Sequence, residues 1–338
     1  PPQSPPPSAS ELVAIPGLNP VIPLGWGALA FIVALVIHEF GHGLQARAHG
    51  MRIRAFGLLQ LGPLPLGAFA EPQYEELTNA PSKERMRMFA AGPATNIFAA
   101  IICLMFLGGL AGQFVASDDG VHVRGIVQEQ GAYEAGLQPW DIIQSIDGQA
   151  ISNVNDFYEI MTAYSANDTI AITVIHQDGG VETLNATLSD KYDYYVDLGW
   201  SKSNLADLGI ERGDPFLGVE GLSSATAGID RLAGPLSPRW DGNILQKSIM
   251  VPFHTLSMMI VPFELQGVAM HPFEESLLAA EDNSFAQTLG TDGLLFLVNL
   301  FFWLLWVNIL LGFTNLIPMV PFDGGHMFKD MLRGILNG

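Results

Sequence analysis

The chain has 338 residues, of which 49% are hydrophobic and only 14% are charged, and its mean hydropathy is +0.29. This charged fraction is well below the roughly 25% of an ordinary soluble domain, so the composition indicates a membrane protein. The net charge of −19 argues against nucleic acid as a partner, and the single cysteine, Cys103, excludes an internal disulfide framework and a cysteine-rich metal cluster.

The acidic charge is concentrated in one block. Residues 118–292 contain 26 acidic and 7 basic residues, whereas the rest of the chain contains 8 of each. The sequence therefore predicts a strongly acidic insert within a nearly neutral, apolar host. Residues 1–20 begin with a proline-rich stretch and are expected to form a flexible lead-in. Because the chain begins at Pro1 instead of a methionine, we expect a fragment or a processed form.

The first apolar segment runs from about Leu24 to Gln45, which is long enough to cross a bilayer, and it ends in the motif HEFGH. His38 and His42 are four residues apart, so they lie on one helix face and can share one Zn²⁺. Glu39 is placed to act as general base on a metal-bound water. The alternative, two histidines at the membrane interface, fits less well because ionisable groups inside an apolar run are costly.

Two features follow this segment. Residues 52–72 are apolar but interrupted by glycine and proline, which predicts short strands joined by a turn. A second span follows Arg87, and no charged residue occurs until Asp118. Residues 21–117 are therefore expected to form the first part of a membrane core.

Residues 118–190 are predicted to be a separate α+β domain. The pattern AGL…DII…IDG, a helix from about Val154 and a hairpin near Asp178 resemble a PDZ domain of the type found in bacterial proteases. The resemblance implies a groove between residues 121–128 and residues 154–164, which takes a peptide or a C-terminus by strand addition. A size filter over the protease site is the alternative role.

Residues 191–292 permit no fold assignment and are expected to be extracytoplasmic or interfacial. Within them, residues 248–270 are apolar enough to be drawn as a further span. Pro252, Pro262 and Glu264 disfavour a straight span, because charge at mid-bilayer is costly. We therefore expect this segment to lie on or dip into the outer interface without crossing.

Residues 293–338 form the second part of the core. The third span, residues 293–313, leads into NLIPMVPFDGGH, where prolines and glycines predict an irregular backbone that lines a cavity. A catalytic zinc needs three protein ligands and one open position. Asp323 is the best candidate for the third ligand, and His326 is its rival.

Together these motifs resemble the site-2 protease family of intramembrane zinc metalloproteases. The family's HExxH motif matches residues 38–42, its Gly-Pro-x-x-Asn motif matches residues 92–96, and its Asn-x-x-Pro…Asp-Gly motif matches residues 315–324. The resemblance implies a polytopic α-helical membrane protein with a three-helix metalloprotease core, a small membrane-associated β element and an inserted extracytoplasmic PDZ domain.

The resemblance also implies roles for individual residues. His38, His42 and Asp323 would bind one Zn²⁺ per chain, and Glu39 would be the catalytic base. Asn315 would contact the substrate backbone, and the two other motif residues Asn96 and Pro318 are further candidates for substrate binding. For Asn96, helix packing is an equal alternative. The β element would pair with unwound substrate, or serve as a cap that seals the site.

The predicted function is intramembrane endopeptidase cleavage of a single-span membrane protein in the lipid bilayer. Six basic residues lie between the first two spans, so the positive-inside rule places that link and the active site toward the cytoplasm of what we expect to be the cell membrane. The acidic insert would then be extracytoplasmic. The alternatives are a PDZ-bearing scaffold without turnover and a metal transporter, which would need several intramembrane ligand sets.

Overall fold

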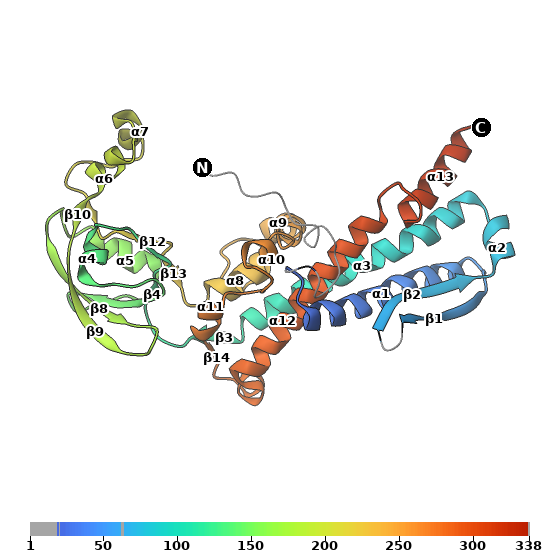
Figure 1. Cartoon of the computed structure of the whole chain (residues 1–338), viewed down its shortest axis with the longest axis horizontal. Coiled ribbons are helices and arrows are strands. Elements are labelled where there is room, and N and C mark those ends of the chain that lie inside the picture. The colour runs from blue at the N-terminus through green and yellow to red at the C-terminus, as the bar shows by residue number, and fades with distance from the viewer. Residues whose placement is uncertain (1–18, 20, 62–63, 337–338) are drawn as a thin grey trace. The chain divides into compact units, whose positions relative to one another are not determined.

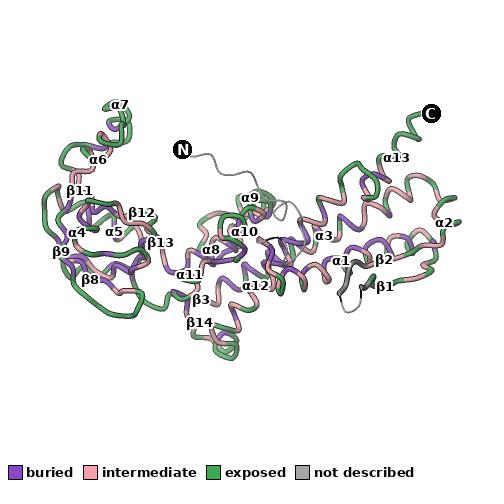
Figure 2. The backbone as a smooth tube through the Cα atoms, viewed as in Figure 1, coloured by how far each residue is buried: buried purple, intermediate pink, exposed green. Residues whose placement is uncertain are grey.

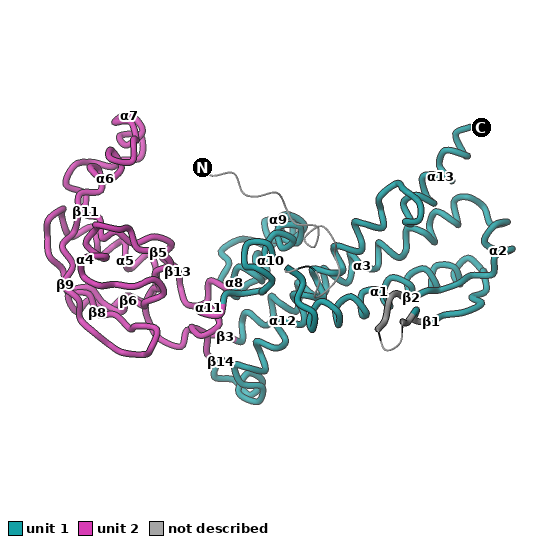
Figure 3. The backbone as a smooth tube through the Cα atoms, viewed as in Figure 1, with its two compact units in different colours: residues 1–113, 229–271, 280–338 teal, residues 114–228, 272–279 magenta. Residues whose placement is uncertain are grey.

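The structure is a computed structural model that describes residue 19 and residues 21–61 and 64–336 (Figure 1). The lead-in predicted for residues 1–20 lies almost entirely outside the described residues. The chain forms two compact units (Figure 3). Unit 1 comprises Pro1–Gln113, Ile229–His271 and Ala280–Gly338, and unit 2 comprises Phe114–Gly228 and Pro272–Ala279.

Unit 1 is built on three long apolar helices, α1 (Leu24–Ala48), α3 (Ser82–Ala111) and α12 (Ser284–Asn315). Each is long and apolar enough to cross a membrane, which confirms the three predicted spans. Many of their residues are exposed or only partly buried in the protein alone, as the colours in Figure 2 show, and such surfaces are expected to face lipid. Gly290 has a φ of +67° and breaks α12 near its start, so the regular apolar part begins just after it.

Helices α1 and α3 pack closely because glycines lie between them. A Cβ atom at Gly41 would lie less than 3.0 Å from the Thr95 side chain and from the Ala91 carbonyl oxygen. A Cβ atom at Gly92 would lie equally close to the rings of both His38 and His42. Small residues at a helix interface allow the two backbones to approach, as is common in membranes.

A hairpin of β1 (Ile53–Leu61) and β2 (Leu64–Pro72) connects α1 to the short helix α2 (Tyr74–Asn79). The strands are antiparallel, with Phe56 opposite Ala70. These are the short strands and turn predicted for residues 52–72. Strand β2 lies beside α1, since the backbone N–H of Ala70 donates to the Glu39 carboxylate at 2.8 Å.

Unit 1 also contains a block of short helices, α8 (Ala227–Ala233), the 3₁₀ helix η1 (Gly234–Leu236), α9 (Ile244–Ser257) and α10 (Val261–Glu264). Leu236 packs on Gly108 of α3, and the Trp306 indole N–H of α12 donates to the Met259 carbonyl at 3.2 Å. The 14 residues of α9 reach about 21 Å, which is less than the roughly 30 Å hydrocarbon core. Within the described residues, segment 248–270 is thus not one spanning helix.

Unit 2 is an α+β domain. Its main sheet has the strand order β13-β4-β6-β8-β9, with β7 paired to β6. These strands are Ser223–Ser224, Val121–His122, Ile142–Ile146, Thr169–Ile175, Val181–Thr187 and, for β7, Gln149–Ala150. Helices α4 (Gly131–Ala135) and α5 (Val154–Met161) accompany this sheet, whose core includes buried Ile143, Phe157 and Ile172.

Short elements complete unit 2. Strand β5 (Gly125–Ile126) pairs with β12 (Val219–Glu220), β10 (Ser189–Asp190) with β11 (Pro215–Phe216), and β3 (Phe114–Ala116) with β14 (Leu278–Ala280). The remaining helices are α6 (Lys191–Asp197), α7 (Lys202–Asp207) and α11 (Pro272–Ser276). The region that had no predicted fold is therefore divided: residues 191–228 and 272–279 belong to unit 2, whereas residues 229–271 and 280–292 belong to unit 1.

His122 of unit 2 gives the protein a pH-dependent stability. Its side chain is buried and stacks on Trp140, and neither ring nitrogen has a hydrogen-bond partner within the described part of the chain. Burial, reinforced by the nearby Arg124 guanidinium against a weaker opposing effect of Glu274, lowers the pKa of His122 to about 4. The unfolded chain binds this proton near pH 6.5, so folding stability falls as the pH drops from about 6.5 to about 4.

We expect His122→Phe to remove much of this dependence. Between pH 7 and pH 4.5 the wild-type protein should lose on the order of 2–3 kcal/mol through this one group. The variant keeps an aromatic ring beside Trp140 but cannot be protonated, so its loss should be smaller. Thermal unfolding of both proteins at the two pH values measures the difference. An equal loss in both proteins would exclude His122 as the source.

Candidate metal centre

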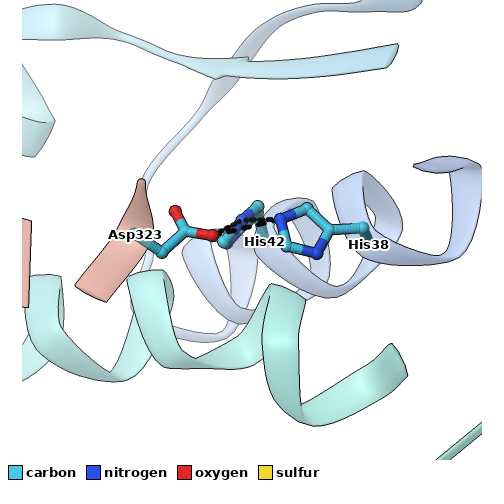
Figure 4. A group of neighbouring side chains, drawn as sticks. All are labelled: His38, His42 and Asp323. Carbon is cyan, nitrogen blue, oxygen red and sulfur yellow. Dashed lines mark hydrogen bonds and ion pairs between the residues drawn. The ribbon is translucent and has the colours of Figure 1, made fainter. Parts of the chain in front are cut away.

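Three side chains from two distant parts of the sequence converge beside α3. His38 and His42 lie on α1, and Asp323 is the first residue of α13 (Asp323–Leu336) (Figure 4). The Asp323 Oδ2 atom lies 3.1 Å from His38 Nε2 and 3.2 Å from His42 Nε2, and the two Nε2 atoms are 3.0 Å apart. Both histidines are buried. Within the described residues, this is the group of three or more His, Cys, Asp or Glu residues suited to a metal ion.

The hydrogen bonds behind the rings show that this donor set fits a cation. His38 Nδ1 donates to Asn96 Oδ1 at 2.9 Å, and His42 Nδ1 donates to the Met88 carbonyl at 2.8 Å. In the neutral rings, each Nε2 therefore carries a lone pair that points toward the other ring and toward a carboxylate oxygen. Three electron-rich atoms so close together repel one another unless a cation lies among them. Tetrahedral zinc ligands are separated by about 3.3 Å, close to the observed spacing.

Asn96 belongs to the support of this group. Its side chain is fully buried, and its amide nitrogen donates to the Ala34 carbonyl at 3.1 Å and to Asn308 Oδ1 at 2.9 Å. These two bonds fix the amide so that its oxygen faces His38. Asn96 was expected among the substrate-binding residues, but the structure places it behind a histidine ring with all of its polar atoms engaged. Its position fits the packing alternative.

Glu39 lies near the three converging side chains, close enough for its carboxylate to interact electrostatically with His38, His42 and Asp323. Its half-buried carboxylate accepts the Ala70 N–H of strand β2. One residue after His38 on α1, Glu39 therefore connects the helix that carries both histidines to strand β2. A backbone donor of this kind carries no residue-type signal, so the sequence did not reveal it.

The loop before Asp323 differs in part from expectation. Residues 316–322 are irregular, as predicted, but Gly324 and Gly325 lie in the first turn of α13. They are glycines because a Cβ at either position would lie less than 3.0 Å from the backbone of residues 316–320. The loop can therefore fold tightly against the helix start and hold Asp323 at its first residue.

The other predicted residues of this region lie outside the three-residue group. Asn315 is the half-buried last residue of α12 and donates to the Leu311 carbonyl at 3.1 Å, and Pro318 is exposed in the loop. His326, the rival ligand, stacks on the Phe89 ring at 4.8 Å instead.

Unit 2 contains a groove of about 720 Å³ between α5 and residues 212–222. Its lining includes Tyr158 and Met161 of α5 on one side and Phe216 and Gly218 on the other. This corrects the expected position of the groove beside residues 121–128. That stretch is broken into β4 and β5, and β12 pairs with β5, so residues that return much later in the chain line the groove next to α5.

Three apolar helices together with an HExxH histidine pair next to an aspartate define a membrane zinc metalloprotease. Comparison with known proteins agrees. The model of peptidase family M50 matches residues 26–337, and the chain belongs to this family. It is therefore an integral membrane protein and a zinc metalloendopeptidase, as predicted from the motifs.

Several relatives share most of the chain. A "Putative zinc metalloprotease" of Mesorhizobium japonicum is 26% identical over 340 residues, which cover 87% of this chain and 84% of the relative. A protein of the same description from Nostoc sp. is 23% identical, and the match covers 91% of this chain and 85% of the relative. An uncharacterized protein of Methanocaldococcus jannaschii is 31% identical over 158 residues, 47% of this chain and 41% of the relative.

Among solved structures, the PDZ domain of an SdrC-like protein from Listeria monocytogenes is similar to part of this chain. The sequence identity is 22% and the TM-score is 0.23, and the match covers 31% of this chain and 90% of that domain.

Proposed function

We propose that this protein cleaves peptide bonds within the membrane-spanning segments of other proteins. The observation that carries the proposal is the position of the His38, His42 and Asp323 group. His38 lies about 21 Å along an apolar helix from its start at Leu24, and glycine Gly92 of a second apolar helix packs against it. A site built from spanning helices is reached most directly by a substrate that is itself in the bilayer.

The chemistry is that of a single-metal peptidase with His38, His42 and Asp323 as ligands of one zinc ion. A zinc ion held by these residues would act as a Lewis acid and would make water a better nucleophile at neutral pH. Glu39 accepts the proton of the attacking water and delivers it to the leaving nitrogen of the peptide. Ala70 orients the Glu39 carboxylate through its N–H, and Asn96 and the Met88 carbonyl hold the two rings in one tautomer.

Strand β2 would present the substrate to this site. In an antiparallel pair the polar backbone groups of successive residues point to opposite sides. Since the Ala70 N–H points to α1, the groups of Ala68 also face away from β1. An unwound substrate can add to this edge as a further strand. Asn315 and Pro318, near the start of the loop that leads to Asp323, are proposed to contact it.

The groove of unit 2 would take an extended peptide or a C-terminus. Tyr158 and Met161 supply apolar contacts, whereas Lys191 and Arg212 line the groove as two of the few basic residues in this acidic unit. A peptide that ends in a carboxylate fits both properties. This partner would be recognised outside the membrane, independently of the metal centre.

The proposed topology places the hairpin side of the protein in the cytoplasm of the cell and the acidic unit outside the cell membrane. The link between α1 and α3 carries six basic residues, as the positive-inside rule requires. Segment 248–270 would then enter from the outer side and contact α12 as far along as Trp306 without crossing the membrane.

Cysteine labelling is expected to show this topology. In a Cys103→Ser background, single cysteines at Ser203 and at Ser284 should both react with an impermeant reagent in intact cells. They flank segment 248–270, so a segment that crosses would leave the second cysteine protected until lysis. That result would also place Asp323 on the opposite side from His38, and the three-ligand site would fail with it.

A Glu39→Gln variant expressed in native membranes tests the function. Without its base, the protein should retain bound substrates, which crosslinking and mass spectrometry would identify as single-span membrane proteins. Incubation of such a protein with the wild-type enzyme should then yield a cut inside the spanning segment. Zinc binding with no cleavage of any captured protein would instead favour a scaffold role.

A further inference from the structure

One face of α3 contacts everything that builds the metal centre. Met88 and Phe89 lie three and four residues after Arg85 and four and three residues before Gly92, so the four residues form a stripe on one face of the helix. Gly92 packs against both histidine rings, and the Met88 carbonyl accepts from His42. The two other members of the stripe, Phe89 and Arg85, contact α13.

The partner stripe on α13 begins with the proposed metal ligand. Asp323, His326 and Asp330 are spaced by three and four residues and share one face. His326 stacks on Phe89 with an angle of 13° between the rings, and Asp330 forms an ion pair with Arg85. The two helices therefore meet in antiparallel order, with Asp323 at the end next to Gly92.

The ion pair between Arg85 and Asp330, at the far end of this contact from Asp323, has the geometry of a strong ion pair. Arg85 Nε donates to Asp330 Oδ2 at 2.9 Å, and Arg85 Nη2 donates to Asp330 Oδ1 at 2.8 Å. The side chains are only 16% and 6% exposed, respectively. Paired bonds of this kind fix direction as well as distance. The third guanidinium nitrogen donates to the Ala80 carbonyl, so the arginine is itself anchored to the segment that follows α2.

The tight loop holds Asp323 at the start of α13, and a contact farther along the helix adds a second point of attachment. Residues 316–322 precede Asp323 as an irregular loop in which residues 316–321 are exposed. A ligand on a helix is placed by the position of that helix, and a displacement of about 0.5 Å is enough to disturb a functional site. The contact with α3 therefore helps to set the axial position and rotation of α13.

We propose that the Arg85–Asp330 pair is a positioning device for the third metal ligand, acting through two turns of α13. The inference rests on the proposed role of Asp323 as a ligand. Neither residue of the pair touches the metal group. Their effect on metal affinity is therefore an outer-sphere effect of the kind that typically changes affinity by about 10–100-fold.

Zinc affinity of the full chain, measured in detergent by competition with a chelator, tests the proposal. Asp330→Asn keeps the shape of the side chain but loses its charge. Arg85→Lys keeps the charge but can no longer donate two parallel hydrogen bonds to the Asp330 carboxylate. Both should weaken zinc binding by about 10-fold or more. The visible absorption of the cobalt-substituted protein should change in both, since it reports ligand geometry. Arg87→Gln, an exposed basic residue on the same helix, is the matched control and should bind as the wild type does.

The reversed pair, Arg85→Asp with Asp330→Arg, separates positioning from loss of folding. A partial return of zinc affinity and of the cobalt spectrum supports the proposal. Wild-type affinity and an unchanged spectrum in Asp330→Asn would overturn it. If Asp323→Ala also retains wild-type zinc affinity, the ligand assignment itself fails. If only Asp323→Ala loses zinc, the assignment stands and the positioning role is rejected.

Discussion

Glu39→Gln is expected to reduce proteolysis by about 10²–10⁴-fold, the range that a positioned general base contributes. Glutamine has the size of glutamate and can still accept the Ala70 N–H through its amide oxygen, so the hairpin should keep its place. It cannot, however, accept a proton. Zinc content should remain near one ion per chain, because Glu39 is not a member of the ligand group. Cleavage of a captured single-span protein and metal analysis of the same sample measure both quantities.

The matched control for this variant is Glu75→Gln, an exposed glutamate on α2. It should leave cleavage and zinc content unchanged. Cleavage by Glu39→Gln at close to the wild-type rate would show that another group moves the proton. Loss of zinc from Glu39→Gln would mean that the carboxylate is a ligand, and the assignment of roles within HEFGH would have to change.

Asp323→Ala should remove zinc and activity together. The site then keeps only two of its three ligands, and the fall in affinity should exceed the roughly 100-fold upper range of outer-sphere changes. His326→Ala is the comparison on the same helix. His326 stacks on Phe89 and is not a member of the His38, His42 and Asp323 group. The variant should keep zinc within about tenfold of the wild type. The reverse pattern would make His326 the third ligand.

The sequence revealed those parts of the site whose chemistry depends on residue type. HEFGH and the Asp-Gly motif stand out because histidine and carboxylate are rare inside apolar segments, and glycine and proline mark the loop between α12 and α13. The three spans were predictable for the same reason, since length and hydrophobicity alone decide them.

The sequence could not reveal the site contacts that are made by backbone atoms or by residues far apart in the chain. The Ala70 N–H and the Met88 carbonyl are present in every residue type, so no pattern marks them as contacts of Glu39 and His42. Arg85 and Asp330 are 245 residues apart, and only folding brings them together. Asn308 did carry a signal, as one of two polar residues in the third apolar segment, and it proves to hold Asn96.

The points where the chain leaves and rejoins the membrane helices lie one hydrogen bond apart. Gln113, after α3, accepts the Glu281 backbone N–H at 2.8 Å, and its side chain accepts from Asn283 at the start of α12. Unit 2, which lies between these residues, can change in length or content without altering the distance that the α3–α12 connection must bridge, whereas residues 229–271 pack on α3 and α12 as part of unit 1. We therefore expect the α3–α12 connection to keep its geometry when the length or content of unit 2 changes.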